Sequence, residues 1–173
     1  DGNLIYFDQS IYDLLANNLS EDKQIDGIVP RIVETISIIN EDKERLEPRT
    51  TLMATNTTSE TNSAFGALIT VDEKKEVYTD SLEFDEVIIN KRLADRLKAE
   101  INDDLFLIYS IVNISDSTES TTIPQNKTVR VKYIVENKGK ANYQGKSIVF
   151  VSISQAQSYF NKSGLINFCL LYT

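Results

Sequence analysis

Apolar side chains recur along the chain at two different periods, which predicts a mixture of strands and short helices. Ile11, Leu14 and Leu15 have the spacing of one helix face, and we expect this helix to run to about Leu19. Between Arg31 and Asn40 β-branched residues dominate, which predicts a long strand. One of its two alternating sets of positions is Ile32, Glu34, Ile36 and Ile38.

The remaining elements follow from the same patterns. Glu41–Glu44 is charged and predicts a turn, so Pro48–Ala54 is expected to be the returning strand of a hairpin. Asn90 is expected to cap a helix whose apolar face is Leu93, Ala94 and Leu97. Further strands are expected at Leu4–Phe7, Asp85–Ile89, Leu105–Ile114, Val129–Tyr133, Ile148–Ile153 and Ile166–Leu171, and Phe65–Val71 is an apolar stretch.

Three other segments are expected to be a helix and two loops. Ser154 is expected to cap a short helix that runs through Phe160 and stops before Gly164. Thr55–Ser63 and Ser115–Asn126 are rich in Ser, Thr and Asn and predict loops. Because the helices are few and short, the sequence predicts an α+β fold with mostly antiparallel sheets.

Composition excludes several classes of function. The chain has 173 residues, 18 Lys and Arg against 26 Asp and Glu, and a net charge of −8, which disfavours binding to nucleic acid. With no His and one Cys, it cannot build a Ser-His-Asp or Cys-His nucleophile system, a Cys/His zinc site or an internal disulfide. The chain starts without Met and stops in the apolar run Phe168–Thr173, so we expect a piece of a longer protein.

No catalytic residue, cofactor site or metal site is predicted. Gly145-Lys146-Ser147 looks like part of a phosphate-binding loop, but the first glycine of that motif would fall on Lys140 and a strand follows instead of a helix. We interpret it as a charged loop. Cys169 is expected to pack as a small apolar residue.

Carboxylates and glycosylation triplets are the other chemical features. Asp72–Glu73, Glu83–Glu86 and Asp103–Asp104 predict a solvated acidic surface, because a glycosidase-type pair requires two carboxylates converging in a cleft. Asn-x-Ser/Thr triplets, which permit glycosylation on an outward-facing domain, begin at Asn18, Asn56, Asn113, Asn126 and Asn161.

An ordered set of segments resembles a known family. Phe84–Leu97, followed by Ile101–Leu105, resembles the extracytoplasmic domain of FtsX-like ABC transporter permeases, the group with MacB-type and lipoprotein-releasing transporters. Further similar segments are Ile25–Arg31, Thr128–Val135, Val149–Phe160 and Gly164–Leu170. Two positions depart from the family pattern of glycine. They are Asn102, where we expect a left-handed backbone that Asn tolerates, and Tyr133.

The resemblance implies a two-lobed, non-catalytic domain on the extracytoplasmic face of the cell membrane. Residues 1–53 together with 149–173 would form a discontinuous α/β lobe near the membrane, and residues 54–148 a smaller inserted β-rich lobe with one helix. The implied partners are a cytoplasmic ABC ATPase acting through the transmembrane helices of the same permease, a second permease subunit, and an extracytoplasmic substrate or protein. Such a domain would transmit ATP-driven movement and needs no cofactor, and its two ends must lie close together.

Two other classes remain open from the sequence. One is a secreted or surface-attached adhesion or ligand-binding module, which would share the acidic surface and the lack of catalytic residues. The other is a hydrolase that uses a carboxylate pair, for which Asp103 and Glu86 are the residues to test. Hydrophobic segments flanking the chain in its gene would favour the permease over the secreted module.

Overall fold

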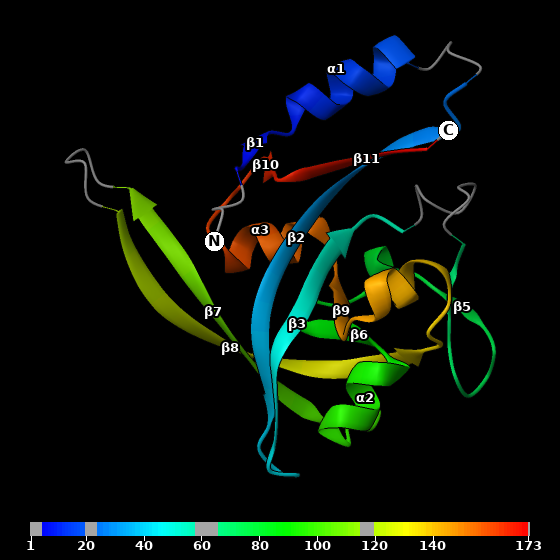
Figure 1. Cartoon of the computed structure of the whole chain (residues 1–173), viewed down its shortest axis with the longest axis vertical. Coiled ribbons are helices and arrows are strands. Elements are labelled where there is room, and N and C mark those ends of the chain that lie inside the picture. Colours follow the sequence, from blue (N-terminus) through cyan, green and yellow to red (C-terminus); the bar gives the residue numbers. More distant parts are fainter. Residues whose placement is uncertain (1–4, 20–23, 58–65, 115–119, 173) are drawn as a thin grey trace.

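The computed structural model describes residues 5–19, 24–57, 66–114 and 120–172 (Figure 1). In chain order its elements are β1 (Phe7–Asp8), α1 (Ser10–Leu19), β2 (Gly27–Asn40), β3 (Arg45–Thr55), β4 (Leu68–Ile69), β5 (Glu76–Val77), the 3-10 turn η1 (Thr79–Ser81), β6 (Glu86–Asn90), α2 (Lys91–Leu97), β7 (Asp104–Ile114), β8 (Ser120–Val135), the 3-10 turn η2 (Gly139–Gly145), β9 (Ile148–Val151), α3 (Ile153–Tyr159), β10 (Leu165–Ile166) and β11 (Phe168–Tyr172). The predicted α+β class is confirmed, because strands dominate and most pairings are antiparallel. Among the described residues, no helix has the length and apolar character needed to span a membrane.

The main sheet closes on itself. Its strand order is β11-β2-β3-β9-β6-β8-β7, and β7 also pairs with β2, so six of the seven strands form a ring. The β3–β9 and β6–β8 pairs are parallel and the others are antiparallel. The closing contact is short: it joins Ser37–Ile39 of β2 to Phe106–Ile108 of β7. Beyond it the β7–β8 hairpin extends away from the body of the molecule (Figure 1).

Alternating side chains of the central strands feed two apolar clusters on opposite faces of the sheet. All four residues of β9 are fully buried. The larger cluster receives Val87, Ile89, Val149 and Val151. The smaller cluster receives Ile88, Ile148 and Phe150.

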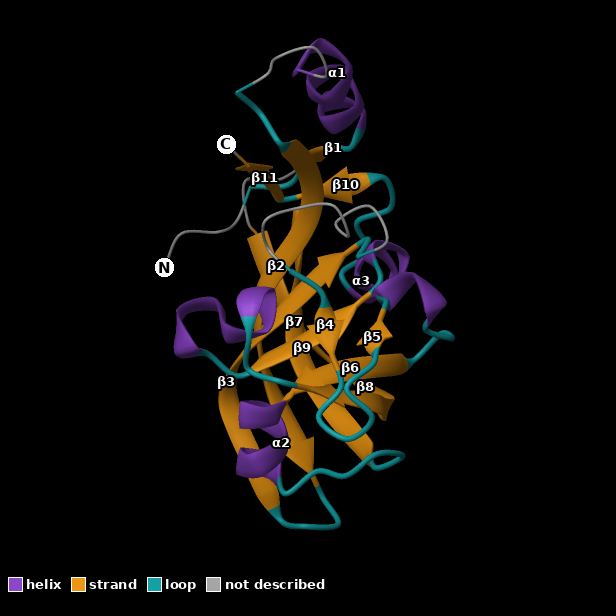
Figure 2. Cartoon of the chain, turned by 90° about the vertical axis from the view of Figure 1, so that its right-hand side faces the viewer, coloured by secondary structure: helices purple, strands orange, loops and turns teal. Residues whose placement is uncertain are grey.

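The helices lie around this sheet, with α1 at one end of the molecule and α2 near the other (Figure 2). Asn90 caps α2 as predicted: its side chain accepts a hydrogen bond from the Leu93 N–H at 3.0 Å. Leu93 and its two predicted partners on the apolar face are buried. In α1 the predicted apolar residues Ile11, Leu14 and Leu15 stay exposed, although Tyr12 packs against the larger cluster.

The cap predicted for α3 is wrong by two residues. Ser152, and not Ser154, is the N-cap, because Ser152 and Gln155 form a capping box in which each side chain bonds to the other's backbone. The Gln155 amide also donates to the carbonyls of Glu83 and Glu86, both at 3.1 Å. These two bonds fix the start of α3 against the start of β6.

The loop predicted over Ser115–Asn126 is largely a strand. β8 begins at Ser120, and Thr121–Asn126 pair in register with β7, while residues 115–119 lie outside the described part. The β-branched side chains of Thr121, Thr122 and Ile123 explain the outcome, because such residues favour an extended backbone when a partner strand is present.

Several other elements differ in extent from what the sequence predicts. The strand expected over Ile166–Leu171 is interrupted at Asn167 and becomes β10 and β11. In the apolar stretch Phe65–Val71, Leu68–Ile69 form the short strand β4. The strand expected over Leu4–Phe7 is observed at Phe7–Asp8, and Leu4 lies outside the described part. Asn102 has the expected left-handed backbone, with φ of 72°, although α2 already ends at Leu97, with Lys98 as its C-cap. Of the segment Thr55–Ser63, Thr55 ends β3 and residues 58–63 lie outside the described part.

Candidate binding site

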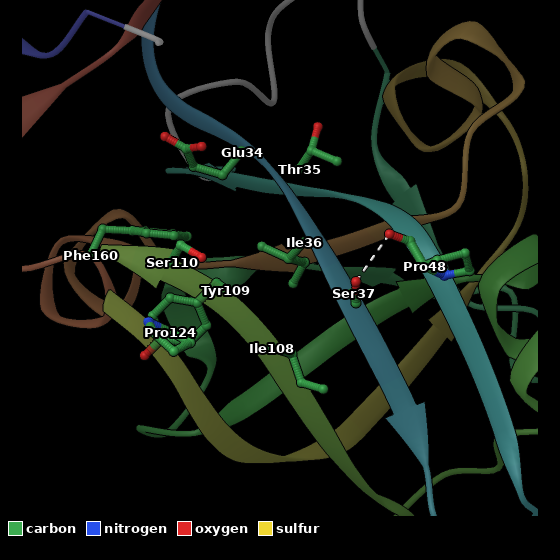
Figure 3. Close-up of a pocket in the computed structure, with 10 residues that line it drawn as sticks. All are labelled: Glu34, Thr35, Ile36, Ser37, Pro48, Ile108, Tyr109, Ser110, Pro124 and Phe160. Atoms are coloured by element: carbon green, nitrogen blue, oxygen red, sulfur yellow. Dashed lines mark hydrogen bonds between the residues drawn. The ribbon is translucent and has the colours of Figure 1, made fainter. Parts of the chain in front are cut away.

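Above their closing contact, β2 and β7 diverge and leave a cavity between them. The ladder of β2 and β7 ends at the pair Ser37 and Ile108. Figure 3 shows the two strands separating from this point, with side chains from both projecting into the gap. The cavity has a volume of about 360 Å³ and is lined by Glu34, Thr35, Ile36, Ser37, Pro48, Ile108, Tyr109, Ser110, Pro124 and Phe160. We call this place the fork.

A half-buried carboxylate lies at the fork. Glu34 accepts hydrogen bonds from the Tyr6 hydroxyl at 2.8 Å and from Asn167 Nδ2 at 3.1 Å. Burial nevertheless raises the pKa of Glu34, because those two bonds and the more distant Lys162 ammonium do not fully offset the lost hydration. Burial and the Glu34 charge in turn raise the pKa of Tyr6, so this phenol stays protonated and acts as a donor.

The upper end of the fork is closed by a side chain. Asn167 stands between β10 and β11, and its amide bonds to both backbone groups of Val33. Because β11 pairs with β2 only as far as Arg31, this amide takes the place of the next strand residue. The fork is thus bounded by Asn167 at one end and by Ile108 at the other.

Aromatic rings form one wall of the fork. Tyr109 packs edge-on against Phe160, with ring centroids 5.1 Å apart, and lies 6.3 Å from the ring of Tyr159. The Tyr159 hydroxyl donates to Asp85 at 3.0 Å, and Asp85 also pairs with Lys127 at 2.8 Å. These contacts connect the wall to the start of β6 and to β8. They favour a cavity that is already formed without a ligand.

Three of the carboxylates singled out in the sequence are held by partners within the chain. Glu86 pairs with Lys132 at 2.8 Å, and this hydrogen bond lowers the pKa of Glu86. Asp103 accepts from the backbone N–H of Glu100 at 3.0 Å, and Asp104 pairs with Arg130 at 3.1 Å. Each has its own partner, which is the behaviour of structural surface charge. Among the described residues, no group of three or more Cys, Asp and Glu side chains could hold a metal ion.

The phosphate-loop look-alike is part of the scaffold. Gly145-Lys146-Ser147 runs directly into the strand β9, as predicted, and not into a helix. The Asn90 amide donates to the Lys146 carbonyl at 2.9 Å, and Asn90 Oδ1 accepts from the Ile148 N–H at 3.0 Å. These hydrogen bonds hold the backbone of the segment against the Asn90 side chain.

Cys169 is half-buried on β11, and its burial raises the pKa of the thiol, which disfavours the nucleophilic thiolate. It packs against the larger apolar cluster, as predicted. Asn18, Asn56, Asn126 and Asn161 are exposed, whereas the side chain of Asn113 lies outside the described part.

Sequence reasoning did not identify the fork, although it contained one signal for it. Glu34 occupies the otherwise apolar set of alternating positions in the long strand, where a carboxylate is unexpected. Asn167 offered no comparable signal, because its partner Val33 is 134 positions away.

Comparisons with known proteins place the fold. No protein-family model matches the sequence, and no curated protein sequence matches it. The structure is similar to the extracellular domain of the noncanonic ABC-type transporter YknZ from Gram-positive bacteria, with a TM-score of 0.59 and 14% identity over 99% of this chain and 75% of that chain. It is also similar to the periplasmic region of MacB from Actinobacillus actinomycetemcomitans, with a TM-score of 0.55 and 11% identity over 94% of this chain. This chain spans 63% of that MacB region. The predicted MacB-like fold is therefore confirmed.

Proposed function

We propose that this chain is a non-catalytic extracytoplasmic domain of an ABC transporter permease of the FtsX, MacB and lipoprotein-releasing kind. The observation that carries the proposal is the shared fold, which extends over 99% of the chain for the YknZ domain and 94% for the MacB region. The paired state of the carboxylates Glu86 and Asp104 supports a binding or mechanical role over a hydrolytic one.

The arrangement of the first and last strands fits a domain joined to membrane helices at both ends. β1 pairs with β10, with Phe7 opposite Ile166 and Asp8 opposite Leu165. β11 then pairs with the start of β2 over Gly27–Arg31. Segments from opposite ends of the chain therefore lie side by side, as they must if both continue into one bundle of transmembrane helices.

The strand β2 supplies a route for movement through the domain. Its 14 residues span about 46 Å in extended form. It hydrogen-bonds to β11 at one end and to β7 at the other. We expect a displacement of the β1, β10 and β11 region to reach the β7–β8 hairpin through β2, because a hydrogen-bonded strand resists stretching and shear.

The two expected lobes would then move largely as one. Residues 1–53 with 149–173, near the membrane, and residues 54–148, farther out, are joined by β9, which pairs with β3 and with β6. The proposed partners are a cytoplasmic ABC ATPase acting through the transmembrane helices of this permease, a second permease subunit, and an extracytoplasmic substrate or protein.

Topology mapping of the native gene product tests the proposal. Glu41→Cys, on the exposed turn after β2, introduces a thiol, and Cys169→Ser removes the native one. In intact cells, a membrane-impermeant maleimide should label the introduced thiol, and the labelled protein should sediment with membranes and resist extraction by alkaline carbonate. The Cys169→Ser protein without Glu41→Cys is the control and should stay unlabelled. Recovery of the labelled protein from the medium, with a signal peptide and no hydrophobic flanks, would instead identify a secreted adhesion or ligand-binding module.

A further inference from the structure

We propose that the fork binds an extended, basic peptide segment of a partner protein, which adds as a strand to the free edge of β7. This inference rests on the proposed function only in placing the partner outside the cytoplasm. It specifies which part of the domain the partner contacts and by what chemistry.

The register of the hairpin shows which way the backbone of β7 points. Ser110 lies opposite Pro124 on β8. Proline has no N–H, so this pair cannot exchange two hydrogen bonds and must be one of the non-hydrogen-bonded pairs of the antiparallel ladder. The N–H and C=O of Ser110 therefore point away from β8 and towards the fork, and those of Val112 do the same two positions on.

These backbone groups have no strand partner among the described residues. The β2–β7 ladder stops at Ile108, so Ser110 is the first β7 residue with a free edge. On the other side of the fork, Thr35 is the next residue of β2 after Ser37 whose backbone N–H and C=O point away from β3. Thr35 too has no pairing with β7. Donors and acceptors thus line the fork in the spacing that an added strand requires.

The two edges of the hairpin are protected unequally. On β8, Pro124 removes a donor from the outer edge and Lys127 adds a charge, and both features discourage pairing with another strand. On β7, the segment Tyr109–Val112 contains neither proline nor a charged residue. Because only the outer edge of β8 is protected against pairing, we expect the free edge of β7 to have a strand partner.

Charge identifies the occupant as basic. The hydrogen-bond partners of the Glu34 carboxylate among the described residues are the neutral side chains of Tyr6 and Asn167. The nearby Lys162 ammonium lies over the Tyr6 ring, 5.4 Å from its centroid. A Lys or Arg of the incoming strand could pair with Glu34 and recover interaction lost on burial. A second copy of this chain, with its net charge of −8, is disfavoured as the occupant.

Hydrogen exchange measured by NMR on this chain tests the proposal. The probes are N-acetylated, C-amidated peptides of about six residues that alternate Thr and Val and carry one Lys, with matched peptides carrying Gln or Glu at that position. At roughly 1 mM Lys peptide, the amides of Ser110 and Val112 should exchange at least about tenfold more slowly. The Glu peptide should protect them least, and Glu34→Gln should abolish the preference for Lys over Gln.

A pair of proline variants tests whether backbone bonds at the β7 edge hold the peptide. Ser110→Pro removes an N–H that faces the fork, and it should weaken binding of the Lys peptide by roughly tenfold or more. Thr122→Pro is the matched control, because Thr122 opposes Val112 in a non-hydrogen-bonded pair and its N–H faces the outer edge of β8. This control should bind as the unchanged chain does. Should Ser110→Pro fail to fold, peptides N-methylated at alternate residues remove the same bonds from the other side.

Each possible result of these experiments either supports or overturns the proposed binding of a peptide strand to β7. Protection at Ser110 and Val112 that is lost with Ser110→Pro or N-methylation supports the added strand, even if the chain proves not to belong to a permease. Absence of protection at 1 mM, or binding that both proline variants leave unchanged, overturns it. Protection of β7 that appears without peptide and depends on chain concentration would show that a second copy is the occupant, which also overturns it.

Discussion

The side-chain amide of Asn167 lies against the backbone of Val33 as a neighbouring strand would. Its Nδ2 donates to the Val33 carbonyl at 3.0 Å, and its Oδ1 accepts from the Val33 N–H at 2.8 Å. The same Nδ2 donates to the Glu34 carboxylate at 3.1 Å. One buried side chain therefore continues the β11–β2 ladder and also supports the carboxylate at the fork.

Substitutions of Asn167 should separate these two roles. Asn167→Ala leaves both backbone groups of Val33 without that partner and should cost about 2 kcal/mol in the free energy of unfolding. Asn167→Asp keeps the acceptor for the Val33 N–H but places a second negative charge beside Glu34. At neutral pH the Asn167→Asp variant should therefore have a lower free energy of unfolding than Asn167→Ala. The difference between the two free energies should become smaller as the pH is lowered.

Urea unfolding at several pH values measures both effects. Asn126→Ala, at an exposed position on β8, is the control and should change the unfolding free energy by less than about 0.5 kcal/mol. Equal losses for Asn126→Ala and Asn167→Ala would show that the amide does not act as a substitute strand.

Glu34 should make the chain less stable as pH rises above the range of an ordinary glutamate. Burial raises the pKa of Glu34 above its usual 4.5, so the folded chain keeps a proton that the unfolded chain has lost. The stability contributed by this proton is complete below pH 4.5 and is lost as pH rises through the folded pKa. Glu34→Gln should therefore gain stability relative to the unchanged chain as pH rises through that interval, as measured by urea titrations.

Glu86 supplies a control of opposite sign. The hydrogen bond from Lys132 lowers the pKa of Glu86 below 4.5, so its contribution is present above that pH and is lost as pH falls through the folded pKa. Relative to Glu86→Gln, the unchanged chain should lose stability towards acid. The same pH trend for Glu34→Gln and Glu86→Gln would contradict the assignment of a desolvated carboxylate to the fork.

Asn90 should be among the most sensitive polar positions of the chain. Its fully buried amide donates to the carbonyls of Ala141 and Lys146 and accepts from the N–H groups of Leu93 and Ile148. Asn90→Ala should cost at least about 3 kcal/mol, because it removes a helix cap and leaves buried backbone groups unsatisfied.

A graded substitution tests the origin of that loss. Asn90→Ser retains an oxygen that can cap α2 but removes the two amide donors, so its unfolding free energy should lie between those of Asn90→Ala and the unchanged chain. A thermal or urea denaturation series provides the ranking. Equal values for Asn90→Ser and Asn90→Ala would assign the whole effect to the lost bonds with Ala141, Lys146 and Ile148.

Cysteines placed on β1 and β10 should join without strain. Phe7 and Ile166 face each other in an antiparallel pair, where Cα atoms lie about 4.5–5.5 Å apart, within the range that a disulfide spans. In a Cys169→Ser background, Phe7→Cys with Ile166→Cys should oxidise in air and leave no free thiol on titration.

The crosslinked variant should also resist unfolding more than its reduced form does, by about 2–4 kcal/mol in the chain-entropy account. Phe7→Cys alone in the same background is the control and should retain one free thiol. A double variant that stays reduced under oxidising conditions would mean that β1 and β10 are not paired in solution.

Local features of the fold were predictable where the signal lies in adjacent residues. Asn90 precedes an apolar helical face, so both the cap and the buried side of α2 could be predicted. The long strand β2 followed from its β-branched composition. The first part of β8, Ser120–Asn126, was missed because Ser and Thr predict a loop by composition, whereas their β-branched or small side chains pair readily once β7 lies beside them.

The fork could not be predicted, because it depends on contacts between distant segments. Its closing contact joins Ser37 to Ile108, and its upper end joins Val33 to Asn167. Pairings of this kind are set by the packing of the whole sheet and leave no periodic trace in the sequence. The local departure at Glu34 was visible, but it could not show what the carboxylate faces.

The central place of β9 has a consequence for biosynthesis. β9 is made after β3 and β6, yet it lies between them and bonds to both. Until Val151 has emerged from the ribosome, the ring of strands cannot close, and the apolar residues of β6 have no complete core to enter. We therefore expect the nascent chain to stay largely unfolded through most of its synthesis and to depend on chaperones that hold such chains, with folding completed late and cooperatively.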